Sequence, residues 1–438
     1  MKKIFLPVLL ISAMLFAACG NLEKSAEPTA APTAAPTQAA AEGGSQTEAV
    51  QPVTSEENPC VPFNLLSQYF MTPYPGLPEV TDDDYIVGPK DAPVTFMVYS
   101  EPQCPYCAQF DPLIESITSL YPNDVRFVFR LRPFPESFHD KSILVSQAMV
   151  AAGLQGKFDE FRIWIFKHQS KNPNDPDVAS LPDTEFWSGL APAEVDNWLK
   201  ERVPELGIDP DQFLKDMVSD AVVKKVQDAK SNADAIGISG TPFLLFNGYA
   251  WPANQQRDIG IFSIFTGLFL NRKVEFTNCP VMTIDQSKSY SATITTTKGD
   301  IVVDLFDDIA PFAVNSFVFL AREGWYDNMP VISTDQFALS GDPTDTGYGG
   351  PGYVYKDEVD STLNFNEPGM LSTFAINIGT GTNGSTFFIN KIALPELAGR
   401  TIFGKVTSGL DVLGKLEIRN NIFNPALDKV LGVTILEK

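Results

Sequence analysis

The stretch from Tyr99 to Phe110 reads YSEPQCPYCAQF, and the stretch from Ile238 to Phe246 reads ISGTPFLLF. In the first, a Cys-x-x-Cys pair follows an apolar run. In the second, a Thr-Pro pair opens another apolar run. This combination is typical of a thiol redox centre, so we expect Cys104 and Cys107 to be the catalytic residues.

Disulfide exchange needs a thiolate nucleophile and a second thiol that resolves the mixed disulfide. Cys104 is expected at a helix N-terminus, where free N–H groups and the positive end of the helix dipole lower a thiol pKa. Cys107 follows one turn later and can act as the resolving thiol. Pro105 suits the first helical position, and Tyr106 offers a hydroxyl but no imidazolium charge. Glu101 is either a proton acceptor for the resolving step or a solvated surface acid.

The alternative for the whole motif is a permanently closed, inert disulfide. In that case the Cys104–Cys107 bond would only stabilise the fold. A test of turnover separates the two interpretations, because only a reactive pair supports repeated exchange.

The N-terminal residues predict export. Residues 1–19 have a basic start and an apolar run too short for a comfortable membrane span, and they end in LFAAC, which resembles a bacterial lipobox. We therefore expect a lipoprotein signal peptide over 1–19 and lipidation of Cys19; simple cleavage and an uncleaved anchor are the alternatives. The predicted location is extracytoplasmic, as a membrane-anchored bacterial lipoprotein. Residues 20–57, rich in Ala, Pro and Thr, predict a disordered linker.

Length and composition set further bounds. A chain of 438 residues is too long for one ordinary core, so two globular domains are expected. The net charge of −22 argues against nucleic acid as a partner, since phosphate binding needs clustered Lys and Arg. Only His139 and His168 supply imidazoles and no Cys/His cluster has metal spacing, so neither a metal nor another cofactor is predicted.

The remaining cysteines suit an oxidising compartment. With Cys19 lipidated and the motif pair set aside, Cys60 and Cys279 remain, and they flank the first domain closely. We predict a structural disulfide between them. Two unpaired buried thiols are the alternative.

The apolar pattern between residues 58 and 283 predicts an α/β domain. The expected elements are strands over 94–100 and 125–131, a helix over 103–120, helical stretches over 137–166 and 191–232 split by a loop over 170–184, a hairpin after Thr241-Pro242, and a closing helix over 257–270.

This order of elements resembles the DsbA-like thiol:disulfide oxidoreductases over about residues 85–273. The resemblance is carried by GPKDAPVTFMVYSEPQCPYC, RFVFRLRPFP, QGKFDEF and GISGTPFLLFNG. It implies a thioredoxin fold with a helical insertion and a cis proline at Thr241-Pro242 facing Cys104. With Pro105 and Tyr106, this loop would bind an extended or unfolded secreted polypeptide as an added strand. The implied second partner is a membrane thiol redox protein.

From residue 284 the pattern changes to alternating strands. TTKGDIVVDLFDDIAPFAVNSFVFLAREGWYDN, SGDPTDTGYGGPGYVYKDE, PGMLSTFAINIGTGTNGSTFFIN and FGKV resemble successive segments of a cyclophilin. The resemblance implies an all-β domain over 284–438, an eight-stranded antiparallel barrel with two helices.

The cyclophilin groove is only partly kept. Asn377, Phe388 and Leu397 match family groove positions, and Phe337 is placed to fill a nearby aromatic one. By resemblance an arginine weakens the amide resonance of the X-Pro bond, but Val331 stands at its position in Met329-Pro330-Val331-Ile332. Three more groove positions have changed; they hold Leu339, Glu396 and Thr401. Arg400, in a neighbouring loop, is the one substitute cation. Phe337 and Phe388 also suit a simple barrel core.

These features predict an extracytoplasmic folding factor that exchanges disulfides through Cys104 and Cys107. Its cyclophilin-type domain is expected to bind peptide with weak or no prolyl isomerase activity. The alternatives are an active cyclophilin-type isomerase and a non-catalytic peptide-binding chaperone. The residues do not indicate the direction of electron flow, the substrates or the oligomeric state.

Overall fold

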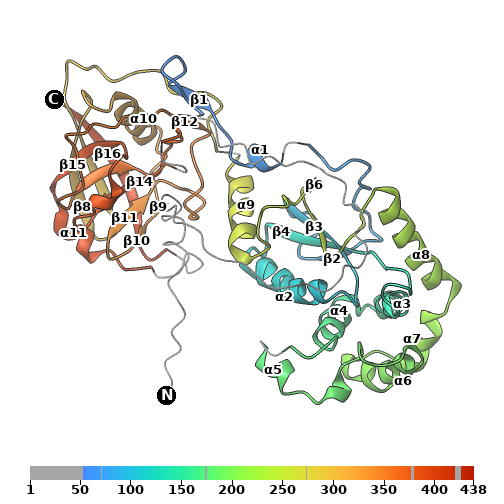
Figure 1. Cartoon of the computed structure of the whole chain (residues 1–438). Coiled ribbons are helices and arrows are strands. Elements are labelled where there is room, and N and C mark those ends of the chain that lie inside the picture. The colour runs from blue at the N-terminus through green and yellow to red at the C-terminus, as the bar shows by residue number, and fades with distance from the viewer. Residues whose placement is uncertain (1–52, 71, 173–174, 273, 376–378, 420–425) are drawn as a thin grey trace, which may run out of the picture. The chain divides into compact units, whose positions relative to one another are not determined.

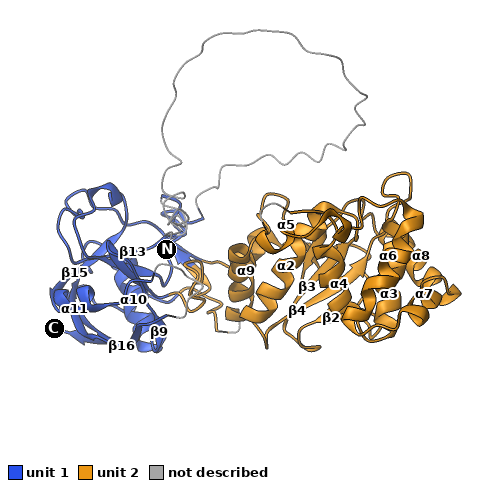
Figure 2. Ribbon diagram, turned by 90° about the horizontal axis from the view of Figure 1, so that it is seen from below, with its two compact units in different colours: residues 1–61, 280–341, 354–438 blue, residues 62–279, 342–353 orange. Residues whose placement is uncertain are grey.

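The structure is a computed structural model, shown in Figure 1. It describes residues 53–70, 72–172, 175–272, 274–375, 379–419 and 426–438. The described residues form two compact units (Figure 2). One consists of residues 62–279 with 342–353, and the other of residues 53–61, 280–341 and 354–438. The predicted signal peptide, Cys19 and most of the predicted linker lie outside the described residues. Within the described ranges, no helix combines the length and the apolar character that a bilayer span requires.

The unit that carries the Cys-x-x-Cys motif is built on a five-stranded sheet in the order β2-β4-β3-β5-β6. Its strands are β2 (Tyr85–Val87), β3 (Val94–Ser100), β4 (Val125–Leu131), β5 (Phe243–Phe246) and β6 (Tyr249–Ala250). Strands β3 and β4 are parallel, and the other neighbours pair antiparallel. The predictions for β3 and β4 are confirmed at both ends. The largely apolar run of β3 suits a central strand that is covered on both faces.

The helices of this unit pack on the sheet or on one another (Figure 1). They are α1 (Leu66–Tyr69), α2 (Pro105–Leu120), α3 (Ser142–Leu154), α4 (Phe158–Lys167), α5 (Pro176–Ala179), α6 (Pro192–Arg202), α7 (Pro210–Met217), α8 (Asp220–Ala235) and α9 (Ile259–Asn271), with 3-10 turns η1 (Asp183–Glu185) and η2 (Val203–Leu206). Phe96 and Val98 of β3 pack in the core that α2, α3, α4 and α9 share. Met97 and Tyr99 lie in a second core with Ala233 of α8. Because successive side chains of a strand point to opposite faces of the sheet, β3 contributes residues to both cores.

The two long helical stretches expected from the sequence are each divided into shorter helices. The first breaks at Gly156, whose φ is +71°, and the second breaks at Gly207, whose φ is +73°. Left-handed backbone ends an α-helix, and glycine adopts it without the steric cost of a Cβ. The fold class is confirmed, and the insertion is a bundle of short helices.

The predicted hairpin after Thr241-Pro242 is confirmed as β5 and β6. Its two turn residues, Asn247 and Gly248, have φ values of +46° and +86°. This is the pattern of the tight turns that match the strand twist. The Asn247 side chain also accepts a hydrogen bond of 2.8 Å from the N–H of Thr95, which ties the turn to the central strand.

Arg162 on α4 joins the helical insertion to the motif helix. Its guanidinium is fully buried and bonds Asp111 and Glu115 on α2 and Asp159 on its own helix. Burial raises the pKa of Asp111 to about 7, against the opposing effect of Arg162. This ion cluster places one cation between two helices that are far apart in the sequence.

We expect Arg162→Met to lower the free energy of unfolding by about 3–5 kcal/mol, because it leaves the buried Asp111 without its partner. Urea unfolding measures the change. The control is Glu115→Gln, since that carboxylate is 44% exposed and should contribute less than about 1 kcal/mol. A loss in Arg162→Met no larger than in the control would contradict the expectation.

The second unit is an antiparallel barrel. Its sheet has nine strands in the order β10-β11-β14-β13-β15-β8-β7-β16-β9. The two ends of this order are consecutive in the chain, because β9 (Met329–Pro330) and β10 (Ile332–Ser333) are separated only by Val331. Counted as one interrupted strand, 329–333 closes the sheet and gives the predicted eight-stranded barrel.

The other strands of this sheet are β7 (Tyr290–Thr296), β8 (Gly299–Leu305), β11 (Phe337–Ser340), β13 (Met370–Thr373), β14 (Phe387–Asn390), β15 (Ile402–Ser408) and β16 (Lys429–Glu437). The helices are α10 (Pro311–Arg322) and α11 (Leu410–Lys415), with a 3-10 turn η3 (Pro395–Leu397). Two short strands lie outside this sheet, β1 (Cys60–Pro62) and β12 (Tyr353–Tyr355).

Candidate functional site

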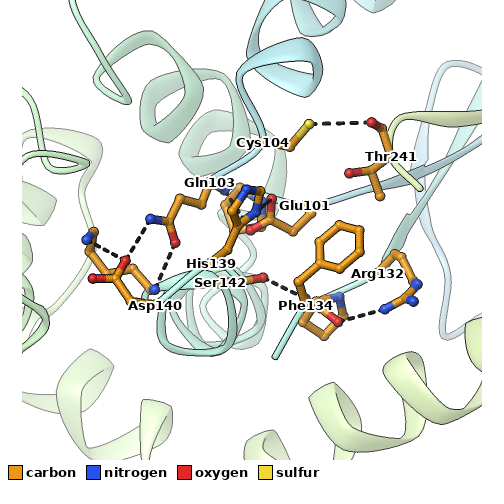
Figure 3. A network of polar contacts seen from close by, with 12 residues as sticks. Glu101, Gln103, Cys104, Arg132, Phe134, His139, Asp140, Ser142 and Thr241 are labelled. Atoms are coloured by element: carbon orange, nitrogen blue, oxygen red, sulfur yellow. Dashed lines mark hydrogen bonds and ion pairs between the residues drawn. The ribbon is translucent and has the colours of Figure 1, made fainter. Parts of the chain in front are cut away.

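Cys104 is the N-cap residue of α2, and Pro105 occupies the first helical position, as the sequence predicts. Both motif cysteines are free thiols, 5% and 1% exposed for Cys104 and Cys107. The Cys104 thiol donates to the carbonyl oxygen of Thr241 at 3.4 Å (Figure 3). The Thr241–Pro242 peptide is cis, the geometry that the resemblance implies. The fold therefore brings together two motifs that lie far apart in the chain.

The two thiols differ strongly in acidity. The Cys107 thiol lowers the pKa of Cys104 to about 5, helped by the N–H groups of Cys107 and Tyr106. Burial, and then the neighbouring Cys104, raise the pKa of Cys107 well above its usual value. The first cysteine is thus the thiolate near neutral pH, and the second is held as a thiol. This asymmetry is what a nucleophile and a resolving thiol require.

Glu101 directly follows β3 and is fully buried, so its interpretation as a solvated surface acid is wrong. The carboxylate accepts from the N–H of Gln103 at 3.0 Å and from His139 Nδ1 at 2.9 Å (Figure 3). Ser142 donates to it as well. Burial nevertheless raises the pKa of Glu101. The side chain of His139 is 20% exposed, so its imidazole connects the buried Glu101 carboxylate with solvent.

Gln103 and Gln169 hold the loop that precedes the motif helix. Gln103 accepts from the N–H of Lys141 at 2.8 Å and donates to Asp140 at 2.8 Å. Gln169, which is 2% exposed, donates to the carbonyl oxygens of Pro102 and Cys104 at 2.6 and 3.1 Å. Neither residue was singled out from the sequence, because each acts on backbone or side chains that are remote along the chain.

A groove of about 680 Å³ opens beside the two motifs. It is lined by Tyr106, Gln109, Phe110, Ser239, Gly240, Thr241, Pro242, Phe243 and Arg257. Tyr106 is 68% exposed, although it is a large aromatic residue. Arg257, which also lines the groove, donates to the carbonyl oxygen of Pro242 at 2.9 Å and so helps to hold the loop in place. Three of the expected site residues, Tyr106, Thr241 and Pro242, line the groove, and the structure adds Arg257, which the sequence did not indicate.

Cys60 and Cys279 are both disulfide-bonded in the structure, as the predicted pairing requires. The alternative of two unpaired buried thiols is therefore wrong.

In the barrel, Phe337, Phe388 and Leu397 belong to one apolar cluster. The rings of Phe337 and Phe388 meet edge to face with their centroids 5.8 Å apart. Phe365 stacks on Phe388 at 5.5 Å. Phe388 is only 1% exposed, so it also forms part of the barrel core. Asn377, the fourth predicted groove residue, lies outside the described residues.

Of the four changed groove positions, three are buried and Glu396 is exposed. Val331 and Leu339 are buried, at 5% and 4% exposure. Thr401 is fully buried, and its hydroxyl accepts from the N–H of Glu358 at 2.8 Å. Arg400, in contrast, is 8% exposed and lies against the rings of Phe374 and Phe388. The structure therefore places a guanidinium in this cluster, at a residue that the sequence only suggested.

Two family models match the chain. Residues 291–432 match the family described as cyclophilin type peptidyl-prolyl cis-trans isomerase/CLD. Residues 80–259 match the family described as thioredoxin.

Among curated proteins, the chain is similar to a peptidyl-prolyl cis-trans isomerase of Helicobacter pylori, with 41% identity over 150 residues, 32% of this chain and 91% of the relative. It is also similar to peptidyl-prolyl cis-trans isomerase-like 2 of Rhizopus delemar, with 44% identity over 138 residues, 30% of this chain. The chain spans only 25% of the length of that fungal relative.

Two solved structures are also similar. A cyclophilin type peptidyl-prolyl cis-trans isomerase of Cryptosporidium parvum matches with 30% identity and a TM-score of 0.32, over 34% of this chain and 98% of the other. A thioredoxin-like oxidoreductase of Silicibacter pomeroyi matches with 21% identity and a TM-score of 0.31, over 40% of this chain and 87% of the other.

Proposed function

This chain belongs to the cyclophilin-type peptidyl-prolyl isomerase family through its C-terminal domain and carries a thioredoxin-like domain before it, and we propose that the thioredoxin-like domain exchanges disulfides with extended polypeptides through Cys104 and Cys107. The observation that carries the proposal is the unequal acidity of the two thiols, with the pKa of Cys104 lowered to about 5 and that of Cys107 raised. A purely structural cysteine pair has no need of such a difference.

The exchange proceeds in two balanced steps. A substrate thiolate attacks Cys104 of the oxidised pair, which forms a mixed disulfide and releases Cys107 as a thiolate that takes up a proton. A second substrate thiolate then attacks the substrate sulfur, and Cys104 leaves as the stabilised thiolate. The substrate loses two electrons and gains a disulfide, and the motif becomes a dithiol. A membrane thiol redox protein is the proposed partner that reoxidises it.

We propose the oxidising direction because stabilisation of the Cys104 thiolate favours the reduced state of the motif, which makes the couple a better electron acceptor. Equilibration of the full chain with glutathione buffers gives its reduction potential. A value above roughly −180 mV supports this direction, and a value near about −270 mV would indicate a reductant. If the full chain failed to oxidise a reduced, unfolded protein in all of these glutathione buffers, the proposed exchange itself would be contradicted.

For the C-terminal domain we propose that the cluster of Phe337, Phe388 and Leu397 holds extended, proline-containing peptide. Isomerase activity by the usual arginine is not expected, since Val331 stands at that position and its side chain cannot donate a hydrogen bond. The specific observation in favour of peptide binding is that these three groove residues are kept together in one cluster.

We further propose that the chain acts outside the cytoplasm, anchored by a lipid on Cys19. Support comes from the signal-like N-terminus and from the disulfide-bonded state of Cys60 and Cys279, since stable disulfides are typical of oxidising compartments. We expect Cys19→Ser to abolish incorporation of a labelled fatty acid and to release the protein from the membrane fraction. A variant that keeps both the label and the membrane location would contradict lipidation at this residue.

A further inference from the structure

Arg400 is a buried cation without hydrogen-bond partners on two of its nitrogens. The residue is 8% exposed, and both Nε and Nη1 are buried and unpaired within the described part of the chain. Burial lowers the pKa of this guanidinium. Because buried donors are almost always paired, a side chain in this state is poised to bond an incoming acceptor.

The surroundings of Arg400 are the aromatic rings of the groove. Its Cζ lies 5.2 Å from the centroid of Phe374 and 5.7 Å from that of Phe388. Cation–π attraction compensates part of the lost hydration. Among the described residues, the guanidinium is held by its contacts with these two aromatic rings. Contacts of this kind do not fix the direction of its N–H groups as hydrogen bonds would. It can therefore move off the ring at low cost and remain beside it.

The chemistry of prolyl isomerisation needs such a donor. Rotation about an X-Pro bond is slow because the nitrogen lone pair is conjugated with the carbonyl group. A donor directed at the prolyl nitrogen localises that lone pair and weakens the conjugation. Val331 cannot supply the donor, and the nearby cation Lys391 already donates to Ser333 at 2.7 Å.

We propose that Arg400 is the catalytic donor of a prolyl isomerase site next to Phe388. The inference rests on the proposed peptide binding by this domain and assigns a reaction to the same cluster. A prolyl ring that packs against Phe388 displaces the guanidinium from the ring face, and the freed N–H groups then lie within reach of the prolyl nitrogen. No bond is made or broken apart from hydrogen bonds, so the step needs no co-reactant.

The test uses the full chain and an Ala-Ala-Pro-Phe peptide, with the cis–trans rate measured by NMR exchange spectroscopy and peptide binding measured by titration. We expect Arg400→Gln to reduce the catalysed rate by about 100-fold with little change in peptide affinity. Arg400→Lys should retain part of the rate because it keeps a charged donor. Arg322→Gln, at an exposed arginine of the same domain, is the matched control and should behave as wild type.

Each other outcome has a definite meaning. If Arg400→Gln is as fast as wild type, Arg400 is not the donor. If Arg400→Gln is faster than wild type and binds peptide more tightly, Arg400 only blocks the groove, which overturns the inference. Wild-type protein that binds the peptide without isomerising it would also overturn the inference and leave the proposed peptide binding intact. Absence of binding by the wild type would remove both.

Discussion

Cys104→Ser should lower the rate of disulfide exchange by about 10³-fold or more, because the serine hydroxyl is not ionised near neutral pH and forms no disulfide. The structure gives Cys104 the lowered pKa and the place next to Thr241, so the loss is expected at this residue whatever the substrate. The measurement is the oxidation of a reduced, unfolded protein, followed by the disappearance of free thiols.

The matched variant is Cys107→Ser. It keeps the nucleophile and removes the resolving thiol, so reaction of its reduced form with a disulfide-containing substrate should stop at the mixed disulfide with Cys104. This adduct would be visible by mass spectrometry under non-reducing conditions. If Cys104→Ser turned over at the wild-type rate, or if the adduct formed at another cysteine, the assignment of the nucleophile would be wrong.

Alkylation of the reduced protein should reveal a thiolate that titrates near pH 5, because the neighbouring Cys107 thiol lowers the pKa of Cys104 to about 5. An ordinary cysteine has a pKa of about 8.5. We therefore expect the rate with iodoacetamide to be nearly constant between about pH 6.5 and 8 and to fall about tenfold per unit well below pH 5. Cys107 should react much more slowly, since its pKa is raised and its side chain is buried.

The same shift gives a pH dependence of stability. The folded pKa of Cys104 lies below the unfolded value, so its contribution is complete above about pH 8.5 and is lost as the pH falls towards 5. Reduced wild-type protein should therefore lose stability relative to Cys104→Ser over this interval, as followed by urea unfolding. An alkylation rate that titrates near pH 8.5, or parallel stability curves, would show that the thiolate is not stabilised.

The parts of the fold that depend on local sequence were predictable. The largely apolar runs of residues 94–100 and 125–131, the second interrupted by two arginines, predicted the ends of β3 and β4, and the Cys-Pro-Tyr-Cys motif predicted the start of α2 to within two residues. The Asn247-Gly248 turn likewise identified a hairpin from two residues. In each case the physical cause acts within a few residues.

The parts of the site that depend on tertiary packing were not predictable. Glu101 and His139 are 38 residues apart, and nothing near either one indicates that the fold buries the carboxylate against the imidazole. The contact of Arg257 with Pro242 spans 15 residues and depends on the geometry of the loop. For Arg400 the sequence supplied the charge, but its position against Phe388 follows from how the barrel packs.

Arg162 also determines how this domain could be made smaller. The redox motif and the central strands of the sheet lie outside the helical insertion, so a shortened protein without the insertion is an obvious engineering target. Its deletion would remove Arg162 and leave Asp111 and Glu115 on the motif helix without their counter-charge. A minimal redox domain derived from this chain would therefore need the buried Asp111 replaced by a neutral residue, whereas Glu115, which is 44% exposed, could keep its charge in contact with water.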